Sequence, residues 1–171
     1  GFTLEELNLG GGYGTRYLES EKEPDIPARI AEVAQRLREQ CEKHAFPLPR
    51  VLMEPGRSIV ADAGMTLYTV SSVKRIPGYK SYVAVDGGMT DNPRYALYGS
   101  RYTVYHAEKS GGKEAVFDLV GRCCESGDII QPKVSLPEDT CRGEHIAVCT
   151  TGAYNYSMAS NYNRLPRPPI V

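Results

Sequence analysis

Leu7-Asn8-Leu9-Gly10-Gly11-Gly12 decides the first half of the fold, because a short apolar run ends there in three successive glycines. Residues without a Cβ let backbone N–H groups converge on an anion. A second apolar run, Arg50-Val51-Leu52-Met53-Glu54, leads into Pro55-Gly56-Arg57. The order predicts two strands, the first of them buried, with a phosphate-binding turn, an acid and an arginine at their carboxyl ends. This is the arrangement at the top of the last two strands of a (β/α)8 barrel.

A helix is predicted between the two strands. Apolar residues recur at three- and four-residue spacing over 26–41, Asp25 is placed to cap the N-terminus, and Pro27 suits the first turn. Residues 4–54 therefore form a strand–helix–strand unit, whose strands must pair in parallel. A second short helix is predicted over 58–63.

From about residue 64 onward the sequence is rich in Val, Thr and Tyr, with Gly and Pro between the runs. This pattern predicts a hairpin with its turn at Pro77-Gly78, and further strands. The predicted strands cover 65–76, 79–86, 102–107, 115–120 and 145–150. The predicted fold class is thus α/β plus all-β: the carboxyl-terminal part of a (β/α)8 barrel over 1–64, then an antiparallel β domain, sandwich or barrel, over 65–171.

Charge and hydropathy argue against several classes of protein. The 171 residues carry 20 Lys plus Arg against 21 Asp plus Glu, a net charge of −1. No basic run favours nucleic acid or an anionic membrane surface. No apolar stretch approaches the roughly 20 residues that span a bilayer. Because no leader-like segment precedes the first strand, the expected location is the cytoplasm.

The cysteines are predicted to be free thiols. Their odd number and the absence of a CxxC pair argue against a disulfide framework and a structural zinc site, and no metal is expected. The five are Cys41, Cys123, Cys124, Cys141 and Cys149.

The barrel part is predicted to be incomplete, because a barrel of this kind needs eight strands and only two are visible. The chain is therefore expected to be a fragment or to be completed by a partner. Exposed strand edges pair readily, so association or disorder is expected in residues 1–64.

Three loops of the second half carry side chains suited to chemistry. In the first, Asp86-Gly87-Gly88-Met89-Thr90-Asp91-Asn92-Pro93-Arg94 ends on an arginine, and Tyr98 follows four residues later. An arginine fork and a phenol suit a substrate carboxylate. The alternative is an ordinary turn with a solvated arginine.

The second loop is Gly121-Arg122-Cys123-Cys124-Glu125-Ser126-Gly127-Asp128. A thiol beside a carboxylate can donate a proton, and the carboxylate can hold an ammonium group. The alternative is that both thiols are buried small apolar groups. In the third loop, Tyr154 follows a strand through Gly152 and is placed to contact a phosphate, although tyrosines in such runs are more often core residues.

Taken in order, these motifs resemble the diaminopimelate decarboxylase family. They are Gly-Gly-Gly at 10–12, Glu-Pro-Gly-Arg at 54–57, Asp-Gly-Gly-Met-Thr-Asp-Asn-Pro-Arg at 86–94, Cys-Glu-Ser-Gly-Asp at 124–128 and Gly-Ala-Tyr at 152–154. The resemblance covers essentially the whole chain and is to the carboxyl-terminal portion of the enzyme.

The resemblance implies decarboxylation of meso-2,6-diaminopimelate to L-lysine and CO2, with pyridoxal 5'-phosphate as the electron sink. Gly10, Gly11 and Gly12 would hold the phosphate, and Glu54 would pair with the pyridine nitrogen. Arg57 and Tyr154 are assigned to both cofactor and substrate.

The remaining roles concern the substrate. The resemblance assigns Arg94 and Tyr98, with Arg57, to the distal carboxylate and Glu125 to the distal ammonium. Cys124 would return the proton, acting from the neighbouring subunit of a homodimer with shared active sites. No lysine of this chain stands in the context of the family's Schiff-base lysine, so the chain alone is expected to be inactive.

Two alternatives stay open. One is a decarboxylase of another basic amino acid or of carboxynorspermidine on the same fold. Arg94 and Glu125 together favour diaminopimelate over these substrates, because ornithine and arginine have no distal carboxylate for Arg94 to pair with. The other is a non-catalytic dimerisation homologue. The intact Glu54, Arg57, Cys124 and Glu125 weigh against it.

Overall fold

In the computed structural model, which describes residues 2–171, the two apolar runs form β1 (Glu6–Asn8) and β2 (Arg50–Leu52). They pair in parallel, as predicted, with Leu7 opposite Val51. The helix between them, α1 (Ile26–Lys43), begins where the sequence predicts, since the Asp25 carboxylate accepts the Ala28 N–H at 3.0 Å. A short helix, α2 (Arg57–Val60), follows β2.

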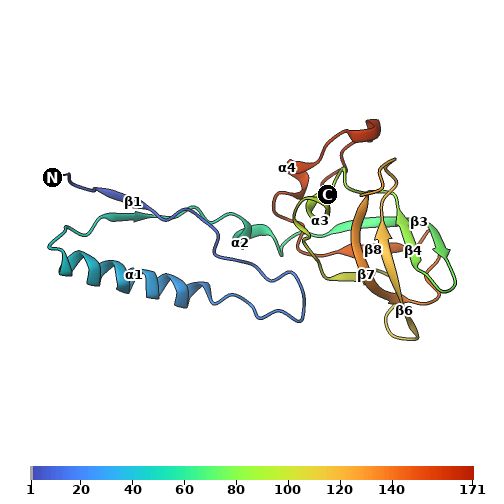
Figure 1. Cartoon of the computed structure of the whole chain (residues 1–171), viewed down its shortest axis with the longest axis horizontal. Coiled ribbons are helices and arrows are strands. Elements are labelled where there is room, and N and C mark those ends of the chain that lie inside the picture. Colours follow the sequence, from blue (N-terminus) through green and yellow to red (C-terminus); the bar gives the residue numbers. More distant parts are fainter. Residues whose placement is uncertain (1) are drawn as a thin grey trace.

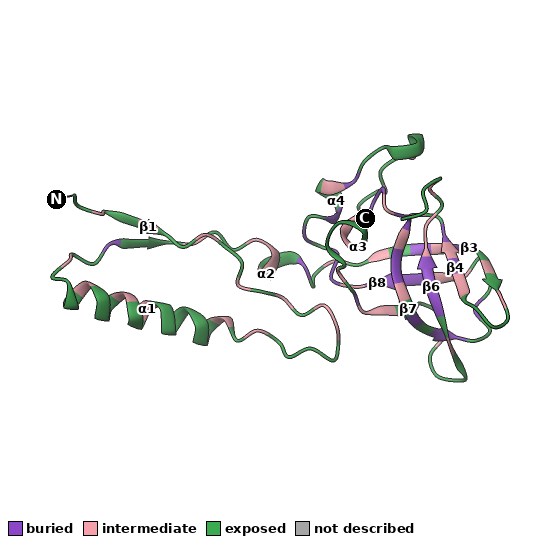
Figure 2. Cartoon of the chain, in the orientation of Figure 1, coloured by how far each residue is buried: buried purple, intermediate pink, exposed green. Residues whose placement is uncertain are grey.

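The amino-terminal part is more exposed than predicted. Figure 2 shows β1, β2 and α1 mostly exposed, whereas the strands of the β domain contain many buried and half-buried residues. The prediction of a buried first strand is wrong for this chain: Glu6 and Asn8 are exposed, and Leu7 is only half-buried. The reason is that β1 and β2 form a two-stranded sheet with no further strand beside it, and α1 has no buried residue.

The second half forms one six-stranded sheet, and Figure 1 labels β3, β4, β6, β7 and β8 in it. The order of its strands is β5-β8-β3-β4-β6-β7. The hairpin at Pro77-Gly78 is confirmed, because β3 and β4 pair antiparallel. One pair departs from the predicted antiparallel domain, since β4 and β6 run parallel. The strands are β3 (Thr66–Arg75), β4 (Ser81–Val85), β5 (Val104–His106), β6 (Glu114–Val120), β7 (Ile129–Pro137) and β8 (His145–Val148), and the short helices are α3 (Arg94–Tyr98), α4 (Asn155–Met158) and η1 (Tyr162–Arg164).

Strand β7 is the strand that sequence patterning missed, and the short helices α3, α4 and η1 were not predicted either. Pro132 and Pro137 lie within β7, and proline is confined to edge strands and irregular positions of a sheet. Both conditions hold here, because β7 is the last strand of the order and its pairing with β6 shifts between Phe117 and Leu119. Next to Pro132, Lys133 has a φ of 55°.

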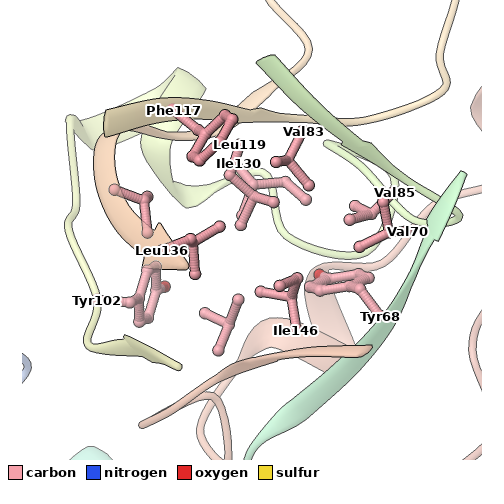
Figure 3. Close-up of a cluster of buried hydrophobic side chains, with 12 residues drawn as sticks. Tyr68, Val70, Val83, Val85, Tyr102, Phe117, Leu119, Ile130, Leu136 and Ile146 are labelled. Atoms are coloured by element: carbon pink, nitrogen blue, oxygen red, sulfur yellow. The ribbon is translucent and has the colours of Figure 1, made fainter. Parts of the chain in front are cut away.

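The sheet encloses a continuous apolar core (Figure 3). Side chains from β3, β4, β6, β7 and β8 and from Tyr102 meet there with almost no exposure, and Val104 of β5 packs against them half-buried. This core fixes the ends of the strands from which the three loops leave. Its members are Tyr68, Val70, Val83, Val85, Tyr102, Phe117, Leu119, Ile130, Val134, Leu136, Ile146 and Val148.

Two glycines join the two halves. The Thr151 N–H donates to Gly64 O at 3.0 Å, and the Gly152 N–H donates to Ala61 O at 2.9 Å. A Cβ on Gly64 would lie 2.6 Å from the Cα of Gly152. The close approach of the two backbones therefore requires residues without side chains.

A partly buried ionic cluster ties the end of β5 to the start of β8. The Glu144 carboxylate accepts from Lys109 Nζ at 2.6 Å, from the Cys141 N–H at 2.8 Å and contacts His106 Nε2 at 2.9 Å. Burial by itself raises the pKa of Glu144, but the hydrogen bonds from these three groups outweigh it and lower the pKa to about 2.

Glu144→Gln is expected to lower the free energy of unfolding by about 1–3 kcal/mol at pH 7, because charge-assisted hydrogen bonds are lost. A depressed pKa stabilises the fold above the unfolded-state value of 4.5, and this contribution disappears as the pH falls toward about 2. Urea unfolding of wild type and variant at pH 7, 4 and 2.5 measures this contribution. The difference in the free energy of unfolding between the two proteins should shrink as the pH is lowered.

Glu138→Gln is the matched control, since Glu138 also pairs with a lysine, Lys113 at 2.9 Å, but is half exposed. Its effect should stay below about 0.5 kcal/mol. An equal loss in both variants, or a Glu144 effect that is independent of pH, would contradict the assignment.

Candidate active site

The glycine turn after β1 has the conformation that its sequence requires. Gly10 and Gly12 have φ values of 69° and 85°, which favour glycine. A Cβ on Gly11 would lie 2.5 Å from the carbonyl oxygen of Glu54. The Glu54 N–H in turn donates to Gly10 O at 2.8 Å. The predicted turn and the predicted acid therefore lie side by side.

Asn8 orients both of them. Its side-chain N–H donates to Glu54 Oε1 at 2.5 Å, and its Oδ1 accepts the Gly10 N–H at 2.7 Å. Sequence reasoning gave Asn8 no role, although a polar residue between Leu7 and Leu9 was a signal. Glu54 stays exposed, so its carboxylate is accessible to a ligand.

Arg57 and Tyr154 contact each other although they come from different halves of the chain. The Arg57 Cζ lies 4.7 Å from the centroid of the Tyr154 ring, and its Nη1 donates to the Tyr17 hydroxyl at 2.6 Å. Tyr154 has a φ of 68°, an uncommon conformation that directs its ring toward α2. Gly56 makes room, because a Cβ there would lie 2.6 Å from the Tyr154 hydroxyl. Tyr17 is a contact that the sequence did not reveal.

Arg94 begins α3 and stacks on Tyr98, with Cζ 5.2 Å from the ring centroid. Its Nη2 donates weakly to Ser100 Oγ at 3.3 Å. Within residues 2–171 its buried Nε has no hydrogen-bond partner. The hydroxyl of Tyr102 and the side-chain amide of Asn155, the residue after Tyr154, are likewise buried without a hydrogen-bond partner in this range.

The Cys124 loop is anchored through its backbone. The Cys124 N–H donates to Asn163 Oδ1 at 2.7 Å, and the side chain of Cys124 is exposed. Glu125 is also exposed and accepts the Gly127 N–H at 3.2 Å. Cys123 is half-buried, and its pKa is raised first by burial and then by the neighbouring Asp128. The exposed thiol is thus the one that was predicted to react.

The predicted residues lie in three places. One contains Gly10–Gly12, Glu54, Arg57 and Tyr154, the second contains Cys124 and Glu125, and the third is the Arg94–Tyr98 contact. Ser160, whose N–H donates to Thr90 O at 2.7 Å, connects the segment after Tyr154 to the 86–94 loop. Across residues 2–171, no hydrogen bond or ion pair joins Cys124 or Glu125 to the first group. Their side chains remain accessible.

Among residues 2–171, no group of three or more His, Cys, Asp or Glu side chains is arranged to hold a metal ion. Over that range, no helix combines the length and the apolar character needed to cross a membrane.

Comparison with known proteins gives consistent results. Residues 24–152 match the family described as pyridoxal-dependent decarboxylase, C-terminal sheet domain. The chain is 46% identical to diaminopimelate decarboxylase of Bacillus subtilis and 49% identical to that of Actinosynnema pretiosum, over 99% and 100% of its length. It spans only 39% of each of these relatives.

Solved structures show the same relationship. A diaminopimelate decarboxylase from M. jannaschii is 32% identical, with a TM-score of 0.88 over 98% of this chain and 37% of that one. A lysine/ornithine decarboxylase from Vibrio vulnificus, complexed with cadaverine, is 26% identical, with a TM-score of 0.80 over 96% of this chain and 42% of that one.

Proposed function

Because this chain belongs to the pyridoxal-dependent decarboxylases, we propose that it forms the carboxyl-terminal portion of an enzyme that converts meso-2,6-diaminopimelate to L-lysine and CO2. The observation that carries the proposal is the contact of Arg57 with Tyr154. It brings a residue of the barrel part and a residue of the β domain to one place, next to the glycine turn and Glu54. The identities of 40–49% to diaminopimelate decarboxylases favour this substrate.

The residues present fit pyridoxal 5'-phosphate. The turn Gly10–Gly12 would hold the phosphate through the N–H groups of Gly11 and Gly12, since the Gly10 N–H already donates to Asn8 Oδ1. The Glu54 carboxylate, fixed by Asn8, would accept the pyridine N–H and keep the ring cationic. When bound, the cofactor supplies an electron sink for the electron pair left by departing CO2.

The distal end of the substrate would be bound by a charge pair. Arg94, with Tyr98 beside it, would bind the carboxylate through its fork of N–H groups, and Arg57 would contribute a second fork. The Glu125 carboxylate would accept a hydrogen bond from the distal ammonium group. Ornithine and lysine lack the distal carboxylate, so on them the Arg94 charge would stay unpaired. For this chain, an activity on lysine or ornithine like that named for the Vibrio vulnificus relative is therefore disfavoured.

Cys124 would return the proton to the carbon that has lost CO2. Its accessible side chain and lack of contact with the Glu54 group favour a role in the site of a second subunit, hence a homodimer with shared active sites. Cytoplasmic location belongs to the same proposal, because all five thiols are free.

The exposed apolar side chains of the first half support completion of the barrel by another part of the protein. Phe2, Val33, Leu48 and Ile59 are among those left more than one-third exposed. Such surface is normally covered in a folded protein. The proposal also keeps the boundary between the barrel part, residues 1–64, and the β domain, residues 65–171.

The proposal is tested with a chimera in which the unmatched amino-terminal part of the Bacillus subtilis relative precedes this chain. Loaded with pyridoxal 5'-phosphate, it should release CO2 from meso-diaminopimelate with a kcat/KM about 100-fold or more above that for lysine or ornithine. Equal rates in a folded, cofactor-loaded chimera would overturn the substrate assignment. The chain alone is the control. After incubation with pyridoxal 5'-phosphate and reduction with borohydride, it should carry no stoichiometric adduct of the cofactor on a lysine.

A further inference from the structure

We propose that Asp128 is a positioning residue that holds together the two loops carrying Arg94 and Cys124. This inference rests on the proposed function for its kinetic consequence, but the contact itself does not. Asp128 lies at the end of the Cys124 loop, is only 5% exposed, and belongs to none of the three groups of predicted substrate or cofactor contacts.

One carboxylate bridges both loops. Its Oδ1 accepts the Met89 N–H at 2.6 Å, in the 86–94 loop. Its Oδ2 accepts the Cys123 N–H at 2.6 Å, directly before Cys124. A backbone hydrogen bond from the Arg122 N–H to Gly87 O, at 3.1 Å, runs beside them. Each oxygen therefore fixes a different loop at a residue near a predicted functional group.

Two glycines are required by this carboxylate. A Cβ on Gly88 would lie 2.6 Å from Oδ1 of Asp128, and one on Gly121 would overlap the same carboxylate. Neither glycine has the positive φ that would otherwise call for this residue. Gly88 and Gly121, one in each loop, are thus explained by the space that Asp128 occupies.

A second buried carboxylate keeps the 86–94 loop folded by itself. Asp91 accepts the Gly88 N–H at 2.9 Å and the Tyr68 hydroxyl. Losing Asp128 should therefore loosen the contact between the two loops, leaving the Arg122–Gly87 backbone hydrogen bond, without unfolding either loop. Arg94 and Cys124 would then no longer be held in a fixed relative position.

The test compares Asp128→Asn with Asp118→Asn. Asparagine keeps the shape but presents an NH2 group to one of the two N–H donors, so one hydrogen bond is lost. Asp118 is the matched control: it is also 5% exposed and also accepts a backbone N–H, from Lys133 at 2.9 Å, but it lies in β6.

The first readout is hydrogen exchange of this chain. In Asp128→Asn, peptides covering 87–92 and 121–125 should exchange about tenfold faster or more, and in Asp118→Asn they should be unchanged. Unchanged exchange in Asp128→Asn, or an equal increase in both variants, overturns the proposal.

The second readout is kinetics in the chimera. Asp128→Asn should raise KM for diaminopimelate and lower kcat, each about tenfold, with cofactor affinity within about twofold of wild type. Unchanged kcat and KM overturn the positioning role. If the wild-type chimera folds, binds cofactor and does not decarboxylate diaminopimelate, the proposed function fails, and the exchange data still decide the contact.

Should Asp128→Asn fail to fold, Gly88→Ala replaces it. The added methyl group would push the Asp128 carboxylate out of its position, although residue 128 itself is unchanged. It should cause the same increase in exchange. Gly127→Ala in the same loop is the control, because its Cβ would meet only Glu125 Oε1 at 3.8 Å. Equal exchange in the two glycine variants overturns the proposal.

Discussion

Replacing Cys124 by alanine in the chimera is expected to lower kcat about 10²- to 10⁴-fold, the usual contribution of a positioned proton donor. KM and cofactor affinity should change little, because the thiol makes no hydrogen bond to the residues around Glu54. Steady-state kinetics with meso-diaminopimelate and cofactor titration measure the three quantities. Cys141→Ala is the control, since Cys141 is equally exposed but lies in the Glu144 cluster.

The same variant tests whether active sites are shared. If Cys124 acts in the partner's site, mixing inactive Cys124→Ala and Glu54→Ala homodimers should restore about a quarter of the wild-type activity, because half the dimers are mixed and each has one intact site. No recovery on mixing, with subunit exchange verified by mass, would place Cys124 and Glu54 in the same subunit's site.

Arg94→Ala should raise KM for diaminopimelate about 100-fold, since losing a charge-assisted bidentate pair costs roughly 3 kcal/mol. Cofactor binding should be unaffected, because the contacts of Arg94 are with Tyr98 and Ser100, not with the glycine turn. Arg94→Lys should recover little, because an ammonium group cannot replace the planar fork. Measurement of KM and of cofactor Kd separates these effects.

Arg75→Ala provides the comparison for Arg94. Arg75 also stacks on an aromatic ring, with Cζ 5.3 Å from the centroid of Phe117, but its side chain donates to Glu138 O, away from both loops. The KM of the Arg75→Ala chimera for diaminopimelate should stay at the wild-type value. Loss of cofactor with an unchanged KM in Arg94→Ala would show that Arg94 belongs to the cofactor site instead.

Local patterns predicted most of the elements correctly. Three- and four-residue spacing, with Asp25 and Pro27, identified α1, and Pro77-Gly78 identified the hairpin of β3 and β4. The patterns failed where a distant partner decides the outcome. Strand β7 contains two prolines that are tolerated because it is an edge strand, and the parallel pairing of β4 with β6 leaves no local signal.

The site follows the same division. Motifs identified Arg57 and Tyr154, which do contact each other, and Glu54, which does lie beside the glycine turn. They did not reveal Tyr17 or the bridging role of Asp128, because these depend on contacts between loops that are distant in sequence. The burial expected for β1 failed for a related reason, since burial depends on neighbours that this chain does not supply.

The joint at Gly64 and Gly152 bears on protein engineering. The two backbones approach so closely that a methyl group on either glycine would overlap the other segment. A β domain exchanged between relatives would therefore need to bring its own glycine to meet the recipient's, or the Arg57–Tyr154 contact would be lost. Recombination libraries built from this family should treat the two positions as one inherited unit and choose crossover points that keep them together.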